Sequence, residues 1–196
     1  MIYSLLIKLG YNEKDKIQSG VNWILNYQSI ERGIECKWSG PDLNSRFGGC
    51  MKKTPCFYGV VKSMIALTEY KKRFGNTTDI DKKLNDGLEY ILRHKVFQRL
   101  STALPIESSI IKNFYPYSYK SNLVEILTLL KSNNLYDDPR CNEAIEILKQ
   151  KKHRDGLWRS EVSQMKSAWI DFDSLNKPGL WISYVIGNLP GLNEQI

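Results

Sequence analysis

Three segments of this chain carry the same apolar pair, an isoleucine followed by a leucine, near the end of a stretch with helical spacing. The pairs are Ile24-Leu25, Ile91-Leu92 and Ile147-Leu148. Each stretch follows an earlier helical stretch across a short polar link, so the helices come in pairs. The interval between the pairs is irregular and longer than that of common solenoid repeats. Because each hairpin must bury one face against its neighbour, the pattern predicts a stack of helical hairpins.

Glycine, asparagine and proline mark the boundaries of the predicted helices. Gly75 and Asn76 stop the helix that begins near Phe57. Asp138-Pro139 favours a new start, because the aspartate can accept from first-turn amides and proline has no amide to leave unpaired. The other predicted N-caps are Asn12 or Asp15, Asp79, and Ser121 or Asn122, and a last apolar helix is predicted over 180–189. Strand-like alternation is nowhere sustained, so the predicted fold class is all-α.

Length and composition fit an ordinary folded protein. With 196 residues, of which 42% are hydrophobic and 25% charged, the chain is long enough for one core and lacks the composition of a disordered segment. We therefore expect a single domain over residues 1–196. No apolar run approaches the roughly 20 residues that span a bilayer, and the start of the chain has no basic leader. These features predict a cytoplasmic protein without a membrane span, in which the cysteines stay reduced.

The charge of the chain bears on its partners. The formal net charge is +7, which attracts polyanions when it is concentrated on one surface. The basic residues instead fall in short clusters at predicted helix ends, such as residues 149–154, where they are expected to be solvated. This distribution argues against a nucleic-acid partner.

One local motif resembles that of a known protein family. The segment Gln150 to Trp158, Gln-Lys-Lys-His-Arg-Asp-Gly-Leu-Trp, resembles the glutamine-tryptophan repeat of squalene-hopene cyclases. Residues 20–33 are similar, with Trp23 and Gln28, although Glu35 stands where that repeat would place a tryptophan. The middle copy, residues 87–95, keeps the helix but has neither glutamine nor tryptophan. In this resemblance the glutamine and the tryptophan form a structural clamp at the end of a helix.

The resemblance extends to the terpenoid cyclase and protein prenyltransferase superfamily, in which helical hairpins close into an α/α toroid around an apolar cavity. The present chain holds fewer hairpins than such a closed ring needs. We therefore expect a toroid-like stack that is an incomplete or open ring, a truncated copy or a portion of a longer protein. A homo-oligomer would be one way to cover the open edge.

The resemblance implies that the chain binds or transforms an apolar isoprenoid-type ligand. Aromatic side chains near the starts of first helices, or in the loops before them, are the candidates for lining its cavity, because their π faces can stabilise a carbocation. Core packing explains the same residues equally well. The competing function is a non-catalytic helical-repeat scaffold that binds a protein or a polyanionic partner. The cavity candidates are Phe57, Tyr58, Tyr115, Tyr117, Tyr119, Trp169 and Trp181.

Catalytic and metal-binding residues are less clearly marked. Squalene-type cyclases protonate an alkene with an Asp-x-Asp-Asp cluster, which this sequence lacks. Asp171 and Asp173 are the candidates that remain, and the alternative is an ordinary pair of loop aspartates. Three thiolates with a fourth ligand can hold zinc in tetrahedral geometry. The candidate zinc ligands are Cys36, Cys50 and Cys56, completed by Asp42, His94 or Cys141; the alternative is that the cysteines are small buried side chains.

Overall fold

The computed structural model describes residues 1–33, 53–163 and 172–193. In these ranges the regular elements are helices, and β-type pairing is limited to isolated bridges. The all-α prediction is therefore confirmed. The chain divides into two compact units, Met1–Ile91 (unit 1) and Leu92–Ile196 (unit 2), which are described separately. The toroid-like ring and the single domain over 1–196 stay predictions.

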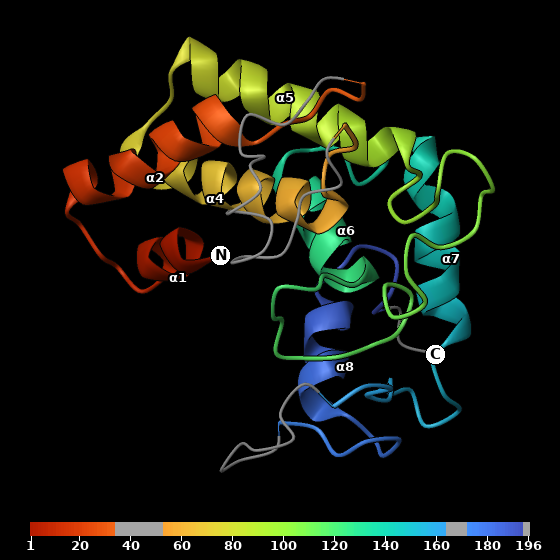
Figure 1. Ribbon diagram of the computed structural model, residues 1–196. Helices are drawn as coiled ribbons and strands as arrows, with labels where there is room; N and C mark the ends of the chain where they lie inside the picture. The colour runs from red at the N-terminus through yellow and green to blue at the C-terminus, as the bar shows by residue number, and fades with distance from the viewer. Residues whose placement is uncertain (34–52, 164–171, 194–196) are drawn as a thin grey trace. The chain divides into compact units, whose positions relative to one another are not determined.

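Unit 1 is built from two helical hairpins, as the paired pattern predicts. The first consists of α1 (Ile2–Lys8) and α2 (Lys14–Tyr27), and the second of α4 (Phe57–Phe74) and α5 (Thr78–Arg93), whose last two residues belong to unit 2. Helices α1 and α2 both pack against α4 (Figure 1). The buried side chains are those of the predicted apolar stripes, including Ile17, Val21, Ile24, Val60, Met64, Leu67, Ile80, Leu84 and Leu88.

The helix ends of unit 1 agree with the predicted stops better than with the predicted caps. Gly75 follows α4 with a φ of 91°, a backbone conformation that glycine adopts without strain. The prediction that Asp79 caps α5 is wrong, because the amide of Ile80 donates to the Thr77 hydroxyl at 3.3 Å. At α2, neither Asn12 nor Asp15 is the N-cap. That position is occupied by Glu13, which makes no side-chain capping bond.

Two close contacts hold the helices of unit 1 together. A Cβ atom added to Gly87 on α5 would lie 2.1 Å from the sulfur of Met64, which is fully buried on α4. The absence of a side chain at this position therefore lets the two helices approach. The second contact is made by Gln28, just beyond α2, whose Oε1 accepts a hydrogen bond from the Ser63 hydroxyl of α4 at 3.1 Å.

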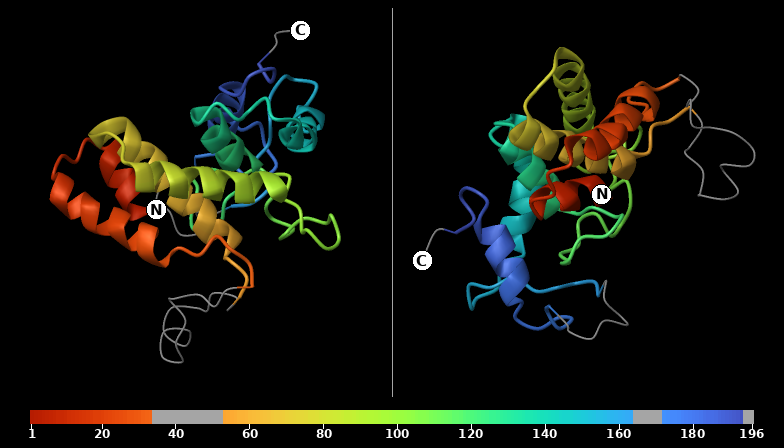
Figure 2. Two further views of the ribbon diagram at one scale, coloured as in Figure 1. Left: turned by 90° about the horizontal axis from the view of Figure 1, so that it is seen from above. Right: turned by 90° about the vertical axis from the view of Figure 1, so that its left-hand side faces the viewer.

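Unit 2 contains shorter helices joined by long irregular segments (Figure 2). They are α6 (Leu123–Ser132), a 3-10 turn (Pro139–Cys141), α7 (Asn142–Gln150) and α8 (Leu180–Gly187). The predicted start at Asp138-Pro139 is confirmed, since the Arg140 amide donates to the Asp138 carboxylate at 2.9 Å. The predicted last helix, 180–189, is also present and ends slightly earlier.

The core of unit 2 is organised around α6. Asn122, one of the two predicted caps, is fully buried and accepts from the Glu125 amide at 3.1 Å. Its own amide nitrogen donates to the Phe114 carbonyl at 3.0 Å, so the same side chain also fixes the preceding loop. The buried apolar residues include Phe114, Leu123, Ile126, Leu127, Leu130, Ala144, Leu148, Ile182 and Ile186. Among the residues placed in either unit, no helix combines the length and the apolar composition needed to cross a membrane.

Candidate functional site

The predicted cavity residues fall into different environments. Phe57 and Tyr58 belong to the core of unit 1, with 6% and 8% of their surface exposed, and the ring centroid of Phe57 lies 6.3 Å from that of Tyr90. For these two residues the structure therefore agrees with core packing, which was the alternative to lining a ligand cavity. Tyr119 in unit 2 is 56% exposed. Trp169 lies outside the described residues.

Tyr115 and Trp181 do come together, and Phe172 joins them. The rings of Tyr115 and Trp181 are nearly parallel, at an angle of 10° and a centroid distance of 6.3 Å. Phe172 meets both rings edge-on, at 5.6 Å from Tyr115 and 5.3 Å from Trp181. We call these three residues the aromatic cluster. Trp181 is 48% and Phe172 36% exposed, so part of the cluster is accessible to a ligand.

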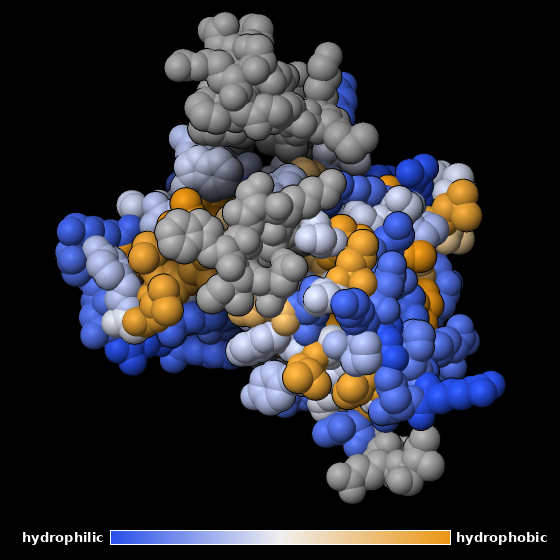
Figure 3. All heavy atoms as spheres, turned by 90° about the horizontal axis from the view of Figure 1, so that it is seen from below, coloured by the Kyte–Doolittle hydropathy of each residue, from blue (hydrophilic) through white to orange (hydrophobic). Residues whose placement is uncertain are grey.

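Tyr117 extends the cluster inward. Its ring centroid lies 5.4 Å from that of Tyr115 and 6.5 Å from that of Phe114. Burial raises the pKa of the Tyr117 hydroxyl well above its ordinary value, so this group stays protonated at neutral pH. In a space-filling view, apolar residues reach the surface in several separate places, surrounded by hydrophilic residues (Figure 3).

Asp173 has a structural role in this arrangement. Its carboxylate accepts from the backbone amides of Trp181 and Ile182, at 3.1 and 2.8 Å, in the first turn of α8. A carboxylate at this position satisfies amides that the helix leaves unpaired, and it also interacts favourably with the helix dipole. Asp173 is therefore a capping residue for α8. Asp171, the other acidic candidate, lies outside the described residues.

The cysteine loop is described only in part. Cys36, Cys50 and Asp42 lie outside the described residues, and Cys56 is partly exposed. Cys141 is fully buried, and burial raises the pKa of its thiol to about 11. His94 is also buried, and its Nδ1 lies 2.7 Å from the Gln98 carbonyl oxygen. Within the described ranges no three His, Cys, Asp or Glu side chains gather as a metal site would require, and zinc stays a prediction.

The glutamine-tryptophan segment holds the end of α7 through its tryptophan. Trp158 is 2% exposed, and its Nε1 donates to the Leu148 carbonyl at 2.7 Å. Gly156, with a φ of 78°, makes the turn that returns the chain to the helix end. The Gln150 amide does not join this contact, because its nitrogen lies 3.5 Å from the Glu146 carboxylate on the exposed side of α7.

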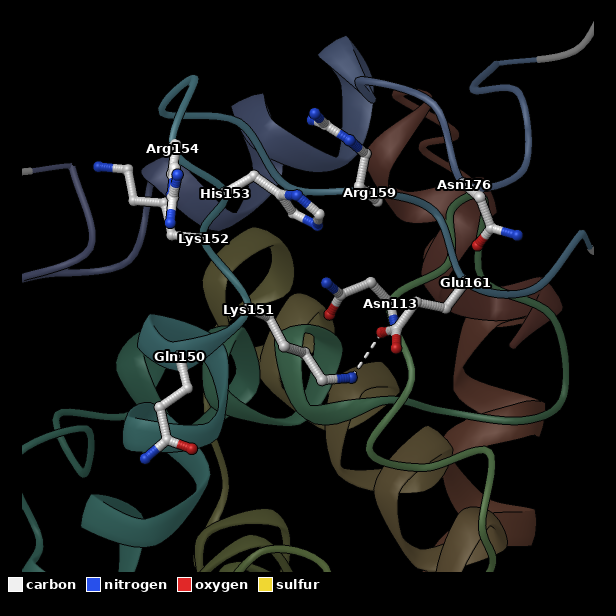
Figure 4. A pocket seen from close by; sticks show the side chains of 9 residues that line it. All are labelled: Asn113, Gln150, Lys151, Lys152, His153, Arg154, Arg159, Glu161 and Asn176. Carbon is white, nitrogen blue, oxygen red and sulfur yellow. Dashed lines mark hydrogen bonds and ion pairs between the residues drawn. The ribbon is translucent and has the colours of Figure 1, made fainter.

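The same turn forms a pocket of about 430 Å³ in unit 2, which we call the basic pocket (Figure 4). Four side chains with a permanent positive charge line it, together with one histidine and a single carboxylate. Four segments supply these side chains: the end of α7 with the turn after it, the loop before α6, the loop before residue 164 and the loop after residue 171. The lining residues are Asn113, Gln150, Lys151, Lys152, His153, Arg154, Arg159, Glu161 and Asn176.

Part of the positive charge in the basic pocket is balanced locally. Lys151 forms an ion pair with Glu161, and the two side chains point toward each other in Figure 4. The backbone N–H of Asn113 donates to the same carboxylate at 2.7 Å. Arg159 binds both carboxylate oxygens of Asp155. This pairing, together with the Leu157 amide, holds the pKa of Asp155 below its ordinary value, so the pair stays charged at neutral pH.

Two further cations, Lys152 and Arg154, line the pocket. The Lys152 ammonium lies 5.2 Å from the centroid of the Trp158 ring and donates to the Leu192 carbonyl at 3.5 Å. Arg154 is exposed and makes no ion pair or side-chain hydrogen bond with any described part of the chain. His153 beside it is also exposed. An arginine, a lysine and a histidine at the rim of a polar pocket can bind an anion through charge-assisted hydrogen bonds.

Only one wall of this pocket is visible in the sequence. Residues 149–154 form the predicted basic cluster at a helix end, and residues 151–154 do follow α7 directly. The sequence does not predict that Arg159, Glu161 or Asn113 lies beside them. The Gly156 turn was the available signal for Arg159, since it reverses the chain. Nothing in the local pattern points to Asn113, which reaches the pocket through a backbone hydrogen bond from Glu161 at 2.7 Å.

No protein-family model, curated protein or solved structure matches this chain. The resemblance to the terpenoid cyclase and prenyltransferase superfamily therefore stays a prediction.

Proposed function

We propose that this protein is a helical binding protein whose unit 2 binds a phosphate-bearing polyanion at the basic pocket. The observation that carries the proposal is the lining of that pocket, which contains four cationic side chains, Lys151, Lys152, Arg154 and Arg159, and one carboxylate, Glu161. Phosphate oxygens accept strong hydrogen bonds from guanidinium and ammonium groups. The attraction is stronger where several cationic side chains converge in a pocket than on an open surface. Polyanion binding corresponds to the non-catalytic scaffold function, which was the competing prediction from the sequence, and not to the enzymatic one.

Binding to a labelled inorganic polyphosphate chain, followed by fluorescence anisotropy at low and moderate salt, tests the proposal. We expect Arg154→Ala to raise the Kd by about tenfold, because a hydrogen bond to a charged group contributes about 1.5 to 3 kcal/mol. Lys82→Ala is the matched control, since it removes one exposed charge from α5 in unit 1. Equal effects of the two variants would mean that only the net charge matters and that the pocket is not the site.

The aromatic cluster supports a second candidate, an apolar isoprenoid-type ligand. Tyr115, Phe172 and Trp181 offer π faces at a partly exposed surface, which suits an unsaturated hydrocarbon chain. Farnesol, an uncharged isoprenoid alcohol, is a suitable probe. If this candidate is right, farnesol quenches tryptophan fluorescence, and the change is lost in Trp181→Phe but kept in Trp23→Phe, a control at an exposed position of α2. Quenching that both variants retain would rule it out.

A further inference from the structure

The basic pocket and the aromatic cluster are built on the same backbone segments of unit 2. Asn113 lines the pocket and Tyr115 belongs to the cluster, so about 7 Å at most separates their Cα atoms. On the other side, Asn176 lines the pocket and lies between Phe172 and Trp181 in the chain. The pocket and the cluster therefore share two backbone segments.

Backbone hydrogen bonds fix this proximity. The Asn176 amide donates to the Ser160 carbonyl at 2.8 Å, and the Gly179 amide donates to the Trp158 carbonyl at 2.9 Å. Arg159, which lies between these two acceptors, pairs with Pro178 in an isolated antiparallel bridge. The segment that carries the pocket cation Arg159 is thus hydrogen-bonded directly to the loop that leads into α8 and Trp181. The two features are therefore carried by backbone segments that are hydrogen-bonded to each other.

A ligand that uses both features needs regularly spaced anions and flat faces that are free to stack. We propose that unit 2 binds single-stranded nucleic acid, with phosphates at the basic pocket and one or two bases stacked on the aromatic cluster. The inference rests on the proposed polyanion binding, because the pocket cations hold the phosphates. It excludes a duplex as the preferred ligand, since paired bases are already stacked on each other and do not offer their faces to side chains.

This inference departs from the expectation drawn from composition, which argued against nucleic acid because the basic residues are spread over helix ends. In the folded chain, one of these clusters lines a pocket instead of being only a solvated helix end. The fold places Lys151, Lys152 and Arg154 around a single pocket with Arg159. It also carries exposed aromatic rings on segments that are hydrogen-bonded to the wall of that pocket. Cations combined with exposed rings bind single strands with little dependence on sequence.

Two oligonucleotides that differ only in their bases test the inference on the unmodified protein. One is a labelled thymidine 12-mer, and the other is an abasic 12-mer with the same sugar-phosphate backbone. We expect the thymidine strand to bind at least about fivefold more tightly, because each stacked base adds a factor of about 5 to 150. Equal Kd values for the two strands would overturn the inference while leaving polyanion binding intact. No binding of either strand would overturn both proposals.

Variants then separate the two contributions. Trp181→Ala and Phe172→Ala are expected to weaken binding of the thymidine strand toward the abasic level and to leave abasic binding unchanged. Arg154→Ala is expected to weaken binding of both strands by a similar factor. Trp23→Ala, at an exposed tryptophan of unit 1, is the aromatic control and should change neither Kd. If Trp181→Ala and Phe172→Ala leave the thymidine strand bound as tightly as before, the bases do not stack on this cluster.

Discussion

Replacing Trp158 by phenylalanine should destabilise unit 2 by removing one buried hydrogen bond. The indole Nε1 donates to the Leu148 carbonyl at 2.7 Å, and the side chain is 2% exposed. Phenylalanine keeps most of the ring but has no donor, so the carbonyl loses this partner and keeps only the Lys151 amide at 3.3 Å, at a cost of about 0.5 to 1.5 kcal/mol. A residual cavity of about 30 Å³ would add about 0.7 kcal/mol, at about 24 cal/mol per Å³. The expected loss is therefore about 1 to 2 kcal/mol.

Urea unfolding followed by far-UV circular dichroism measures this loss. For a denaturant slope of about 2 kcal/mol per molar urea, the midpoint should fall by about 0.5 to 1 M. Because the two units can unfold separately, hydrogen–deuterium exchange resolved by mass spectrometry should assign the loss to peptides of α7 and the turn after it.

A matched control is available in the same unit. Trp181 is 48% exposed and its indole nitrogen makes no hydrogen bond to a described residue, so Trp181→Phe should change stability by only about 0.5 kcal/mol. If Trp158→Phe shifts the midpoint no more than Trp181→Phe does, the Leu148 contact contributes nothing measurable. The structural role assigned to Trp158 would then be wrong.

Three further predictions concern unit 2. Asn122→Ala should cost about 2 to 3 kcal/mol in urea unfolding, because it removes a helix cap and a buried donor, whereas Asn122→Asp should keep the cap and lose less. Cys141, whose pKa is raised from 9.0 to about 11, should make stability fall as the pH rises from about 9 toward 11, because the unfolded thiol ionises first; Cys141→Ala should lack this component of the pH profile. Asp173→Ala should lower the helical signal of α8 and cost about 1 kcal/mol, while Asp173→Asn should lose less.

The helices could be predicted from the sequence because apolar spacing is a local property. The stripes that include Ile17, Met64 and Leu84 are buried as expected, and the stop at Gly75 is where the turn residue places it. The caps were less predictable. Thr77 and Asp79 are both good capping residues two positions apart, and only the actual backbone path decides which one accepts the amide of Ile80.

The candidate site could be predicted only where its residues are neighbours in the chain. The run from Lys151 to Arg154 is visible in the sequence, but its meeting with Asn113 and Glu161 depends on loops without periodicity. The aromatic cluster shows the same limit. Tyr115 and Trp181 are both predicted cavity residues, whereas Phe172 is not among them, because no pattern relates loop positions that meet through tertiary packing.

The contact between Gly87 and Met64 has a consequence for recognising relatives of this chain. The Met64 side chain occupies the space that a Cβ atom at position 87 would need, and it is fully buried. A larger residue at 87 therefore favours a shorter one at 64, so the two positions should co-vary among homologous sequences. Their pairing would help to recognise such sequences without reference to the glutamine-tryptophan resemblance, because residues 87–95 contain neither glutamine nor tryptophan.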